Sequence, residues 1–191
     1  DNRGWTEIHC AAAGGSVPVI KTLMQAGLDI TARTNDGLHV LHIAAINENL
    51  PIVKYLIETQ SQLLQQTQNH GMTALHCAAV RCGFPVIETL MQAGLDITAK
   101  TNHGSNVLHI AAQNDNLRIV KYLIETQPHL LQETENRGRT ALHCAVAGGS
   151  VPVIETLMQA GLDITARTNN GLHVLHIAAM NDNQKIVNYL I

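Results

Sequence analysis

The chain has 191 residues, of which 46% are hydrophobic and 3% aromatic, and its formal net charge is −3. This length and composition predict an ordinary folded domain with a substantial core, and the small net charge gives no electrostatic reason to expect nucleic acid or an acidic membrane as a partner. The longest apolar runs are too short to span a bilayer, and no signal peptide is visible.

The first 33 residues predict two short helices followed by a turn. The stretch "TEIHCAAAGG" begins at Thr6, a natural N-cap, and its helix stops at Gly14–Gly15. Ser16 can cap a second helix, which Gly27 ends. The following "DITARTNDG" predicts an extended run into a turn.

Residues 34–67 predict a related unit with a different ending. No glycine follows the second helix in "YLIETQSQLLQQTQNHG". We expect that helix to run longer, or to restart as a short turn around Leu63–Leu64.

These two units recur along the chain at a spacing of 67 residues. Units like the first (A repeats) start at Asp1, Gln68 and Glu135, and units like the second (B repeats) start at Thr34, Thr101 and Thr168. One helix pair cannot bury its apolar face alone, so the pattern predicts a single domain over 1–191, an all-α repeat solenoid. The predicted repeats are 1–33, 34–67, 68–100, 101–134, 135–167 and a truncated 168–191.

The repeated words resemble those of the ankyrin-repeat family. "GWTEIHCAA", "GMTALHCAA" and "GRTALHCAV" are similar to the family's Gly-x-Thr-Pro-Leu-His-x-Ala-Ala, and "AGLDI" to its Gly-Ala-Asp word. The resemblance covers essentially the whole chain. It implies helix-turn-helix units with β-hairpin-like finger loops, and a protein-binding module or scaffold without catalysis.

The resemblance also implies structural roles for the repeated polar residues. The histidine of each word is expected to bond the threonine hydroxyl of its own repeat and a nearby backbone carbonyl: His9, His42, His76, His109, His143 and His176. In the B repeats His39, Asn106 and His173 replace that threonine; asparagine is a good N-cap and histidine a poor one. Glu48, Asp115 and Asp182 replace the family's glycine between the helices.

Histidine–cysteine neighbours also raise the hypothesis of metal or nucleophile chemistry. Cys10 and Cys77 lie two repeats apart, about 16–20 Å, which is too far for a disulfide or a shared zinc ion. Adjacent residues on one helix also diverge by about 100°. We therefore interpret these cysteines as small apolar residues.

Three other sets of residues were considered as sites. His39-x-x-His42 and His173-x-x-His176 have the spacing of a two-ligand metal clip, but no third ligand stands nearby, so we favour the interpretation that His39 and His173 fill the threonine position of the cap network. Cys82 beside Arg81 has the surroundings of a reactive thiol, against the alternative of an ordinary turn residue. Asp29, Asp96 and Asp163 are too far apart for paired acid–base chemistry, and the resemblance implies that they bond within their loops.

The sequence contains no Gly-rich phosphate loop, no Ser-His-Asp arrangement and no HExxH word. We therefore expect no enzyme activity, no cofactor and no metal. The four cysteines form no C-x-x-C pair, which favours a reducing compartment, such as the cytoplasm, or the host cytosol for an effector. The chain begins without Met and stops within a helical pattern, so we expect a piece of a longer protein.

The resemblance places partner binding on the finger tips and the exposed side of the first helix. The residues predicted there are Arg3, Trp5, Asp36, Leu38, Ile46, His70, Met72, Arg81, His103, Gln113, Arg137, Arg139, Leu172 and Met180. Trp5, Leu38, Met72 and Leu172 are predicted apolar anchors. A mild excess of basic residues favours an acidic or mixed-polarity protein segment as the ligand of a monomeric module, with no nucleic acid and no membrane insertion.

Two alternatives remain open from the sequence. One is a targeting arm of a larger enzyme or host-directed effector whose catalytic domain lies elsewhere, and the other is a structural spacer. The near-identity of the double units favours a spacer, whereas the variable apolar tips favour a binding module.

Overall fold

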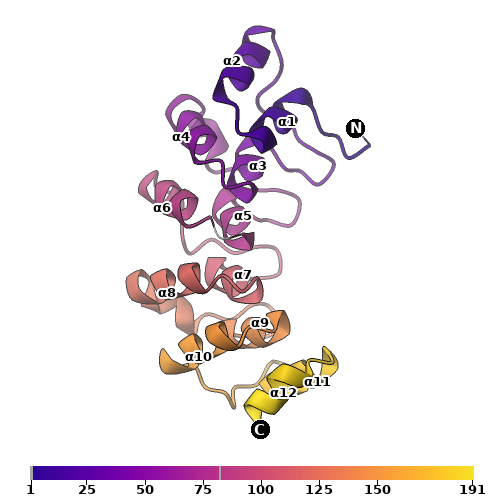
Figure 1. Cartoon of the computed structure of the whole chain (residues 1–191), viewed down its shortest axis with the longest axis vertical. Coiled ribbons are helices and arrows are strands. Elements are labelled where there is room, and N and C mark those ends of the chain that lie inside the picture. The colour runs from indigo at the N-terminus through magenta and orange to yellow at the C-terminus, as the bar shows by residue number, and fades with distance from the viewer. Residues whose placement is uncertain (1, 82) are drawn as a thin grey trace. The chain divides into compact units, whose positions relative to one another are not determined.

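The computed structural model describes residues 2–81 and 83–191 (Figure 1). The chain divides into two compact units, with the boundary between Asn102 and His103. All regular structure in the described ranges is helical. This confirms the predicted all-α repeat solenoid, in which the finger loops contain turns rather than strands.

The unit that ends at Asn102 contains three helix pairs. The first helices of the pairs pack in one row, α1 on α3 and α3 on α5, and the second helices pack in another, α2 on α4 and α4 on α6. The bounds are α1 Glu7–Gly14, α2 Val17–Gln25, α3 Val40–Ile46, α4 Leu50–Thr59, the 3₁₀ helix η1 Ser61–Leu63, α5 Ala74–Val80 and α6 Phe84–Gln92.

The unit that begins at His103 repeats this arrangement. Helices α7, α9 and α11 form the row of first helices, and α8 packs on α10 among the second helices. The bounds are α7 Val107–Gln113, α8 Leu117–Thr126, the 3₁₀ helix η2 Pro128–Gln132, α9 Ala141–Gly148, α10 Val151–Gln159, α11 Val174–Met180 and α12 Gln184–Leu190.

Small and branched residues divide the core between them. Alanines such as Ala44 and Ala78 are fully buried, which lets the first helices approach closely, while Ile20 and Leu56 fill the space beneath from the second helices. Burying each such large aliphatic side chain contributes about 1.5–3 kcal/mol. The core therefore forms between neighbouring pairs as well as within each pair.

The predicted ending of the B repeats is confirmed in both of its forms. Helices α4 and α8 have ten residues, whereas α2, α6 and α10 have nine. A 3₁₀ helix then follows in each case. Leu63 and Leu130 in these 3₁₀ helices are almost fully buried, so the extra segment closes one side of the repeat.

In five helix pairs of the described ranges, a residue with positive φ lies in the turn between the two helices. Gly15 and Gly149 do this in A repeats with φ near 80°. In the B repeats Glu48, Asp115 and Asp182 adopt positive φ between 52° and 58°. The backbone of these three residues is in the left-handed region, which glycine adopts without strain and residues with a side chain do not.

A row of asparagines joins the finger loops. The backbone N–H of Asn69 donates to the Asp36 carbonyl, and its Nδ2 donates to the Asn35 carbonyl at 2.9 Å. The same pair of bonds links Asn169 to the carbonyls of Arg137 and Asn136. Each contact requires a glycine in the preceding finger, because a Cβ there would collide with the asparagine. At Gly71, for example, the Cβ would lie 2.5 Å from Oδ1 of Asn102. Each finger is thereby fixed to its neighbour.

Candidate functional site

The repeated histidines form a structural network. In the first repeat the Thr6 backbone N–H donates to Nδ1 of His9 at 3.0 Å, and the Thr6 hydroxyl lies 3.0 Å from the same atom. Because Nδ1 accepts, Nε2 carries the proton and donates to the Ala32 carbonyl, 3.0 Å away. In the next repeat His42 Nε2 reaches forward to the Met72 carbonyl at 3.1 Å. These contacts confirm both implied bonds for His9 and the carbonyl bond for His42, whose Nδ1 accepts the His39 N–H in place of a threonine bond, while Nε2 of His143 is buried without a hydrogen-bond partner.

His39 and His173 fill the threonine position of the cap network, which confirms the interpretation favoured from the sequence, although histidine is in general a poor N-cap. Their Nδ1 atoms accept the backbone N–H of Leu41 and Leu175, each at 3.2 Å. The ring thus imitates the Oδ1 of Asn106, which accepts from two backbone N–H groups at the same place in its repeat. An unprotonated ring nitrogen thus accepts one of the two bonds that the amide oxygen accepts.

This capping role also removes the candidate metal clip of His39 and His42. Both Nδ1 atoms accept backbone N–H groups, and His42 Nε2 bonds to Met72, so only His39 Nε2 is left. Burial lowers the pKa of His39 to about 2 and that of His42 to about 4. Among the described residues no group of three or more metal-ligating side chains comes together.

The cysteines differ in their surroundings. Cys77 and Cys144 are buried in α5 and α9, and burial raises the pKa of each thiol to about 12. They are inert apolar residues, as interpreted from the sequence. Cys10 is exposed instead. The candidate reactive thiol, Cys82, lies outside the described residues.

The repeated aspartates bond within their own loops. Oδ1 of Asp29 accepts the Thr31 backbone N–H at 2.8 Å and its hydroxyl at 2.7 Å. These two bonds lower the pKa of the Asp29 carboxyl. Asp96 and Asp163 make the same contacts with Thr98 and Thr165, so the three carboxylates stabilise turns.

The residues predicted to bind a partner fall into two groups by exposure. The exposed ones are Arg3, Asp36, His70, Arg81, His103, Gln113, Arg137 and Met180. The half-buried ones are Trp5, Leu38, Ile46, Met72, Arg139 and Leu172. The four predicted apolar anchors therefore show only part of their surface to solvent. Met180, at the end of α11, is 73% exposed.

The structure brings four of these residues together in one pocket. Arg137 and Arg139 come from one finger, Leu172 from the next finger and Met180 from the end of α11. The pocket, named here the Arg137–Met180 pocket, has a volume of about 210 Å³, and Thr168 and Asn170 complete its lining. Thr168 was not predicted. Its recurrence beside the finger tip in every B repeat is the sequence feature that could have predicted it.

In the unit that ends at Asn102, several of the predicted residues contact neighbouring residues of their own unit. The Arg3 guanidinium lies 5.4 Å from the centre of the Trp5 ring, which in turn lies edge-on to His9. The Asp36 and His70 carbonyls accept the backbone N–H groups of the following finger. These tips are therefore held partly by their own unit.

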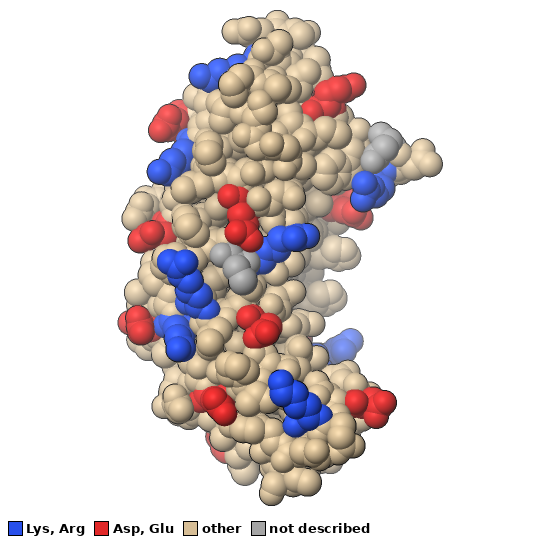
Figure 2. Space-filling model, in the orientation of Figure 1, with Lys and Arg blue, Asp and Glu red and all other residues tan. Residues whose placement is uncertain are grey.

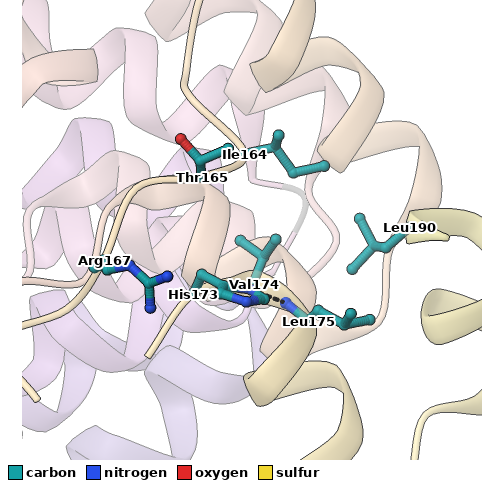
Figure 3. Close-up of a pocket in the computed structure, with 7 residues that line it drawn as sticks. All are labelled: Ile164, Thr165, Arg167, His173, Val174, Leu175 and Leu190. Carbon is teal, nitrogen blue, oxygen red and sulfur yellow. Dashed lines mark hydrogen bonds between the residues drawn. The ribbon is translucent and has the colours of Figure 1, made fainter. Parts of the chain in front are cut away.

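A second pocket, of about 290 Å³, lies beside α11 and α12 (Figure 3). Its sticks come from the loop before the finger (Ile164, Thr165, Arg167), the start of α11 (His173, Val174, Leu175) and the end of α12 (Leu190). The matching pocket beside α3 is lined by Thr31, Arg33 and His39 together with residues in and after η1. It is thus a feature of the repeat framework.

Charges of both signs are interspersed on the face in view in Figure 2. Arg33 and Arg167 each use a guanidinium N–H to bond a finger carbonyl, that of Gly37 and that of Gly171. These two arginines hold their fingers in place. In the described part of the chain no helix is long and apolar enough to cross a membrane.

Family models for ankyrin repeats match residues 8–101, 99–168 and 149–191. The chain therefore belongs to the ankyrin-repeat family, whose repeats generally mediate protein–protein interaction, and the described residues are built from such repeats only.

Among relatives, mouse Rabankyrin-5 is 27% identical over 169 residues, which cover 87% of this chain and 14% of that protein. The palmitoyltransferase AKR1 of Debaryomyces hansenii is 33% identical over 168 residues, covering 82% of this chain and 20% of the enzyme. The chain thus spans only a small part of these relatives. One chain in a solved complex of a Bdellovibrio bacteriovorus predatory endopeptidase with an immunity protein matches 98% of this chain and is itself covered to 97%, at a TM-score of 0.76 and 28% identity.

Proposed function

We propose that this chain is a non-catalytic protein-binding module that holds a partner on its finger tips and the exposed ends of its first helices. The observation that carries the proposal is the Arg137–Met180 pocket, where four residues predicted from the sequence line one hollow. An exposed methionine beside arginines has the composition of an interface anchor. The six predicted repeats would act together as one domain.

The fold supplies the mechanism of this function. The histidine caps and the asparagine row fix each finger to the repeats around it. A partner would meet side chains that are already in position, so binding costs little conformational entropy. The similar chain from Bdellovibrio bacteriovorus was solved in a complex of two proteins, which supports a module that binds protein.

The test is a capture experiment from the native cell with the chain as bait. A pocket variant carries Arg139→Ala, Leu172→Ala and Met180→Ala, and a control variant carries Lys54→Ala, Lys121→Ala and Lys185→Ala on the second helices. Circular dichroism verifies that both remain folded. We expect a protein captured by the wild type and the control to be absent with the pocket variant. Equal recovery with all three baits would exclude this face as the site.

A second candidate is a targeting arm within a larger enzyme. It is favoured by the match to 20% of a palmitoyltransferase. In that case the same face would bind a substrate protein, and an activity assay of the longer protein with the pocket variant would show a raised KM with an unchanged kcat. A structural spacer would give no specific capture in the first experiment.

A further inference from the structure

The two arginines of the Arg137–Met180 pocket are available for a ligand. Neither guanidinium group of Arg137 or Arg139 has a hydrogen bond or ion pair with any described residue. Their backbone carbonyls do the structural work, accepting from Asn169 and His109. The guanidinium groups of Arg33 and Arg167, by contrast, donate hydrogen bonds to finger carbonyls.

The described acidic groups of the same elements form no ion pair with Arg137 or Arg139. Glu135 begins the finger, and its Oε1 atom is buried without a hydrogen-bond partner, while the charges of Arg139 and Glu135 both act on the Cys144 thiol. Asp182 follows α11, outside the lining of the pocket. Two positive charges therefore face the pocket without a paired carboxylate from the described residues.

Two of the other residues that line the pocket, Leu172 and Met180, are apolar. Leu172 is half-buried, and Met180 keeps 73% of its surface exposed, although large apolar residues seldom stay so exposed without a partner. A volume of about 210 Å³ is below the range of about 300–1,000 Å³ that is typical of sites for drug-sized ligands. The pocket suits one or two side chains of a longer partner.

The matching positions in the other double units lack this combination. The first double unit has Arg3 over Trp5, with the carboxylate of Asp36 at the position of Asn170. The second has His70 and Met72, with Gln113 at the position of Met180. Within the chain, the paired arginines with two apolar neighbours occur only at 137–180.

We propose that the Arg137–Met180 pocket binds an acidic side chain and an adjacent apolar side chain from an extended segment of the partner protein. This rests on the proposed function and names the chemistry of its ligand. The carboxylate pairs with Arg137 and Arg139, whose planar guanidinium groups suit two parallel hydrogen bonds. The apolar neighbour packs on Leu172 and Met180.

The test starts with a phage-displayed library of random peptides selected on the whole chain. The most enriched peptide is synthesised with a fluorescent label, and fluorescence polarisation gives its Kd for the wild type and three variants. These are R137Q/R139Q, M180A and, as a charge-matched control on the second helices, K121Q/K185Q. The peptide is also made with its acidic residue changed to the amide.

We expect the enriched peptides to share an Asp or Glu next to an apolar residue. R137Q/R139Q should weaken binding about tenfold, as expected for loss of a charged hydrogen bond, and K121Q/K185Q should leave it unchanged. The amide peptide should lose about the same factor with the wild type and nothing more with R137Q/R139Q. Added salt should weaken the acidic peptide more than the amide peptide.

The other outcomes separate this inference from the proposed function. A peptide weakened by M180A but bound equally by R137Q/R139Q would overturn the acidic ligand and keep the binding face. A peptide that binds all variants alike would overturn both. Failure to enrich any peptide would overturn a linear ligand for the pocket, while capture of a folded partner tests the face separately.

Discussion

The buried histidines have one protonation state that the fold accepts. Nδ1 of His39 and His42 accepts a backbone N–H, so a proton on that atom would face another donor. Burial disfavours the charged ring as well, and it is the main cause of the lowered pKa values, about 2 for His39 and about 4 for His42. The same direction holds for His9 and His143.

Stability should therefore fall as the solution becomes acidic. Below a pH of 6.5 the unfolded chain binds protons that the folded rings refuse, so the free energy of unfolding decreases towards pH 5, and His39 alone accounts for about 2 kcal/mol of the loss. We predict that His39→Asn, which copies Asn106, keeps its stability at pH 7 and loses about 2 kcal/mol less by pH 5. Urea unfolding at both pH values measures this, and identical pH dependence of the two proteins would contradict it.

The left-handed residues between helices offer a second test at the same scale. Glu48 has φ 58°, where a side chain costs about 1–2 kcal/mol and glycine does not. We predict that Glu48→Gly raises the free energy of unfolding by about 0.5–1 kcal/mol. Glu48→Ala is the control, since alanine keeps the strain. A gain with alanine as large as with glycine would show that the effect comes from removing the charge.

At the level of the helix, two equivalent glycines have opposite surroundings. Gly14 ends α1 with nothing within 4 Å of an added Cβ. Gly148 ends α9, and a Cβ there would press on the Gln113 carbonyl of α7, within 2.9 Å of its carbon. The sequence makes the two positions look alike, and only the packed neighbour distinguishes them.

We predict that Gly148→Ala destabilises the protein by about 2 kcal/mol, because the backbone of α7 must move. Gly14→Ala should be neutral or stabilising by about 0.5 kcal/mol, since alanine favours the helix. Thermal and urea unfolding of the two variants make the comparison. Equal effects would mean that the close contact at Gly148 is relieved without cost.

The helices themselves were predictable from short signals. Threonine caps, helix-ending glycines and the Leu-Leu word located α1, α2 and the 3₁₀ helices, because these features depend on residues close in sequence. The cap by His39 was expected from its place at the threonine position, but the sequence did not show which ring nitrogen would be free of its proton and accept the bond. That choice is made by burial, which local sequence does not report.

At the scale of the whole molecule, the period predicted which residues lie on equivalent fingers. It did not predict that Arg137, Arg139, Leu172 and Met180 would line one pocket while Arg3 stacks on Trp5. Whether a tip arginine is bound within the protein depends on the neighbouring finger, so equivalent positions acquire different surroundings. Repetition predicts the framework better than it predicts the site.

The asparagine row makes whole double units interchangeable. If residues 68–134 are deleted, Thr67 joins Glu135, and Asn136 takes the place of Asn69 beside the carbonyls of Asn35 and Asp36. We predict that this shortened chain still unfolds in one cooperative transition, with a urea m-value about two-thirds of the original because less surface becomes exposed. A broad, non-cooperative transition would show that the middle repeats are indispensable.

The junctions between neighbouring fingers are therefore chemically equivalent. At each junction an asparagine donates to carbonyls of the preceding finger. Recombination between copies can therefore add or remove a 67-residue double unit and keep the same bonds at the new junction. The number of repeats can change in such a gene while the fold is preserved, and the finger-tip side chains can diverge separately in each double unit.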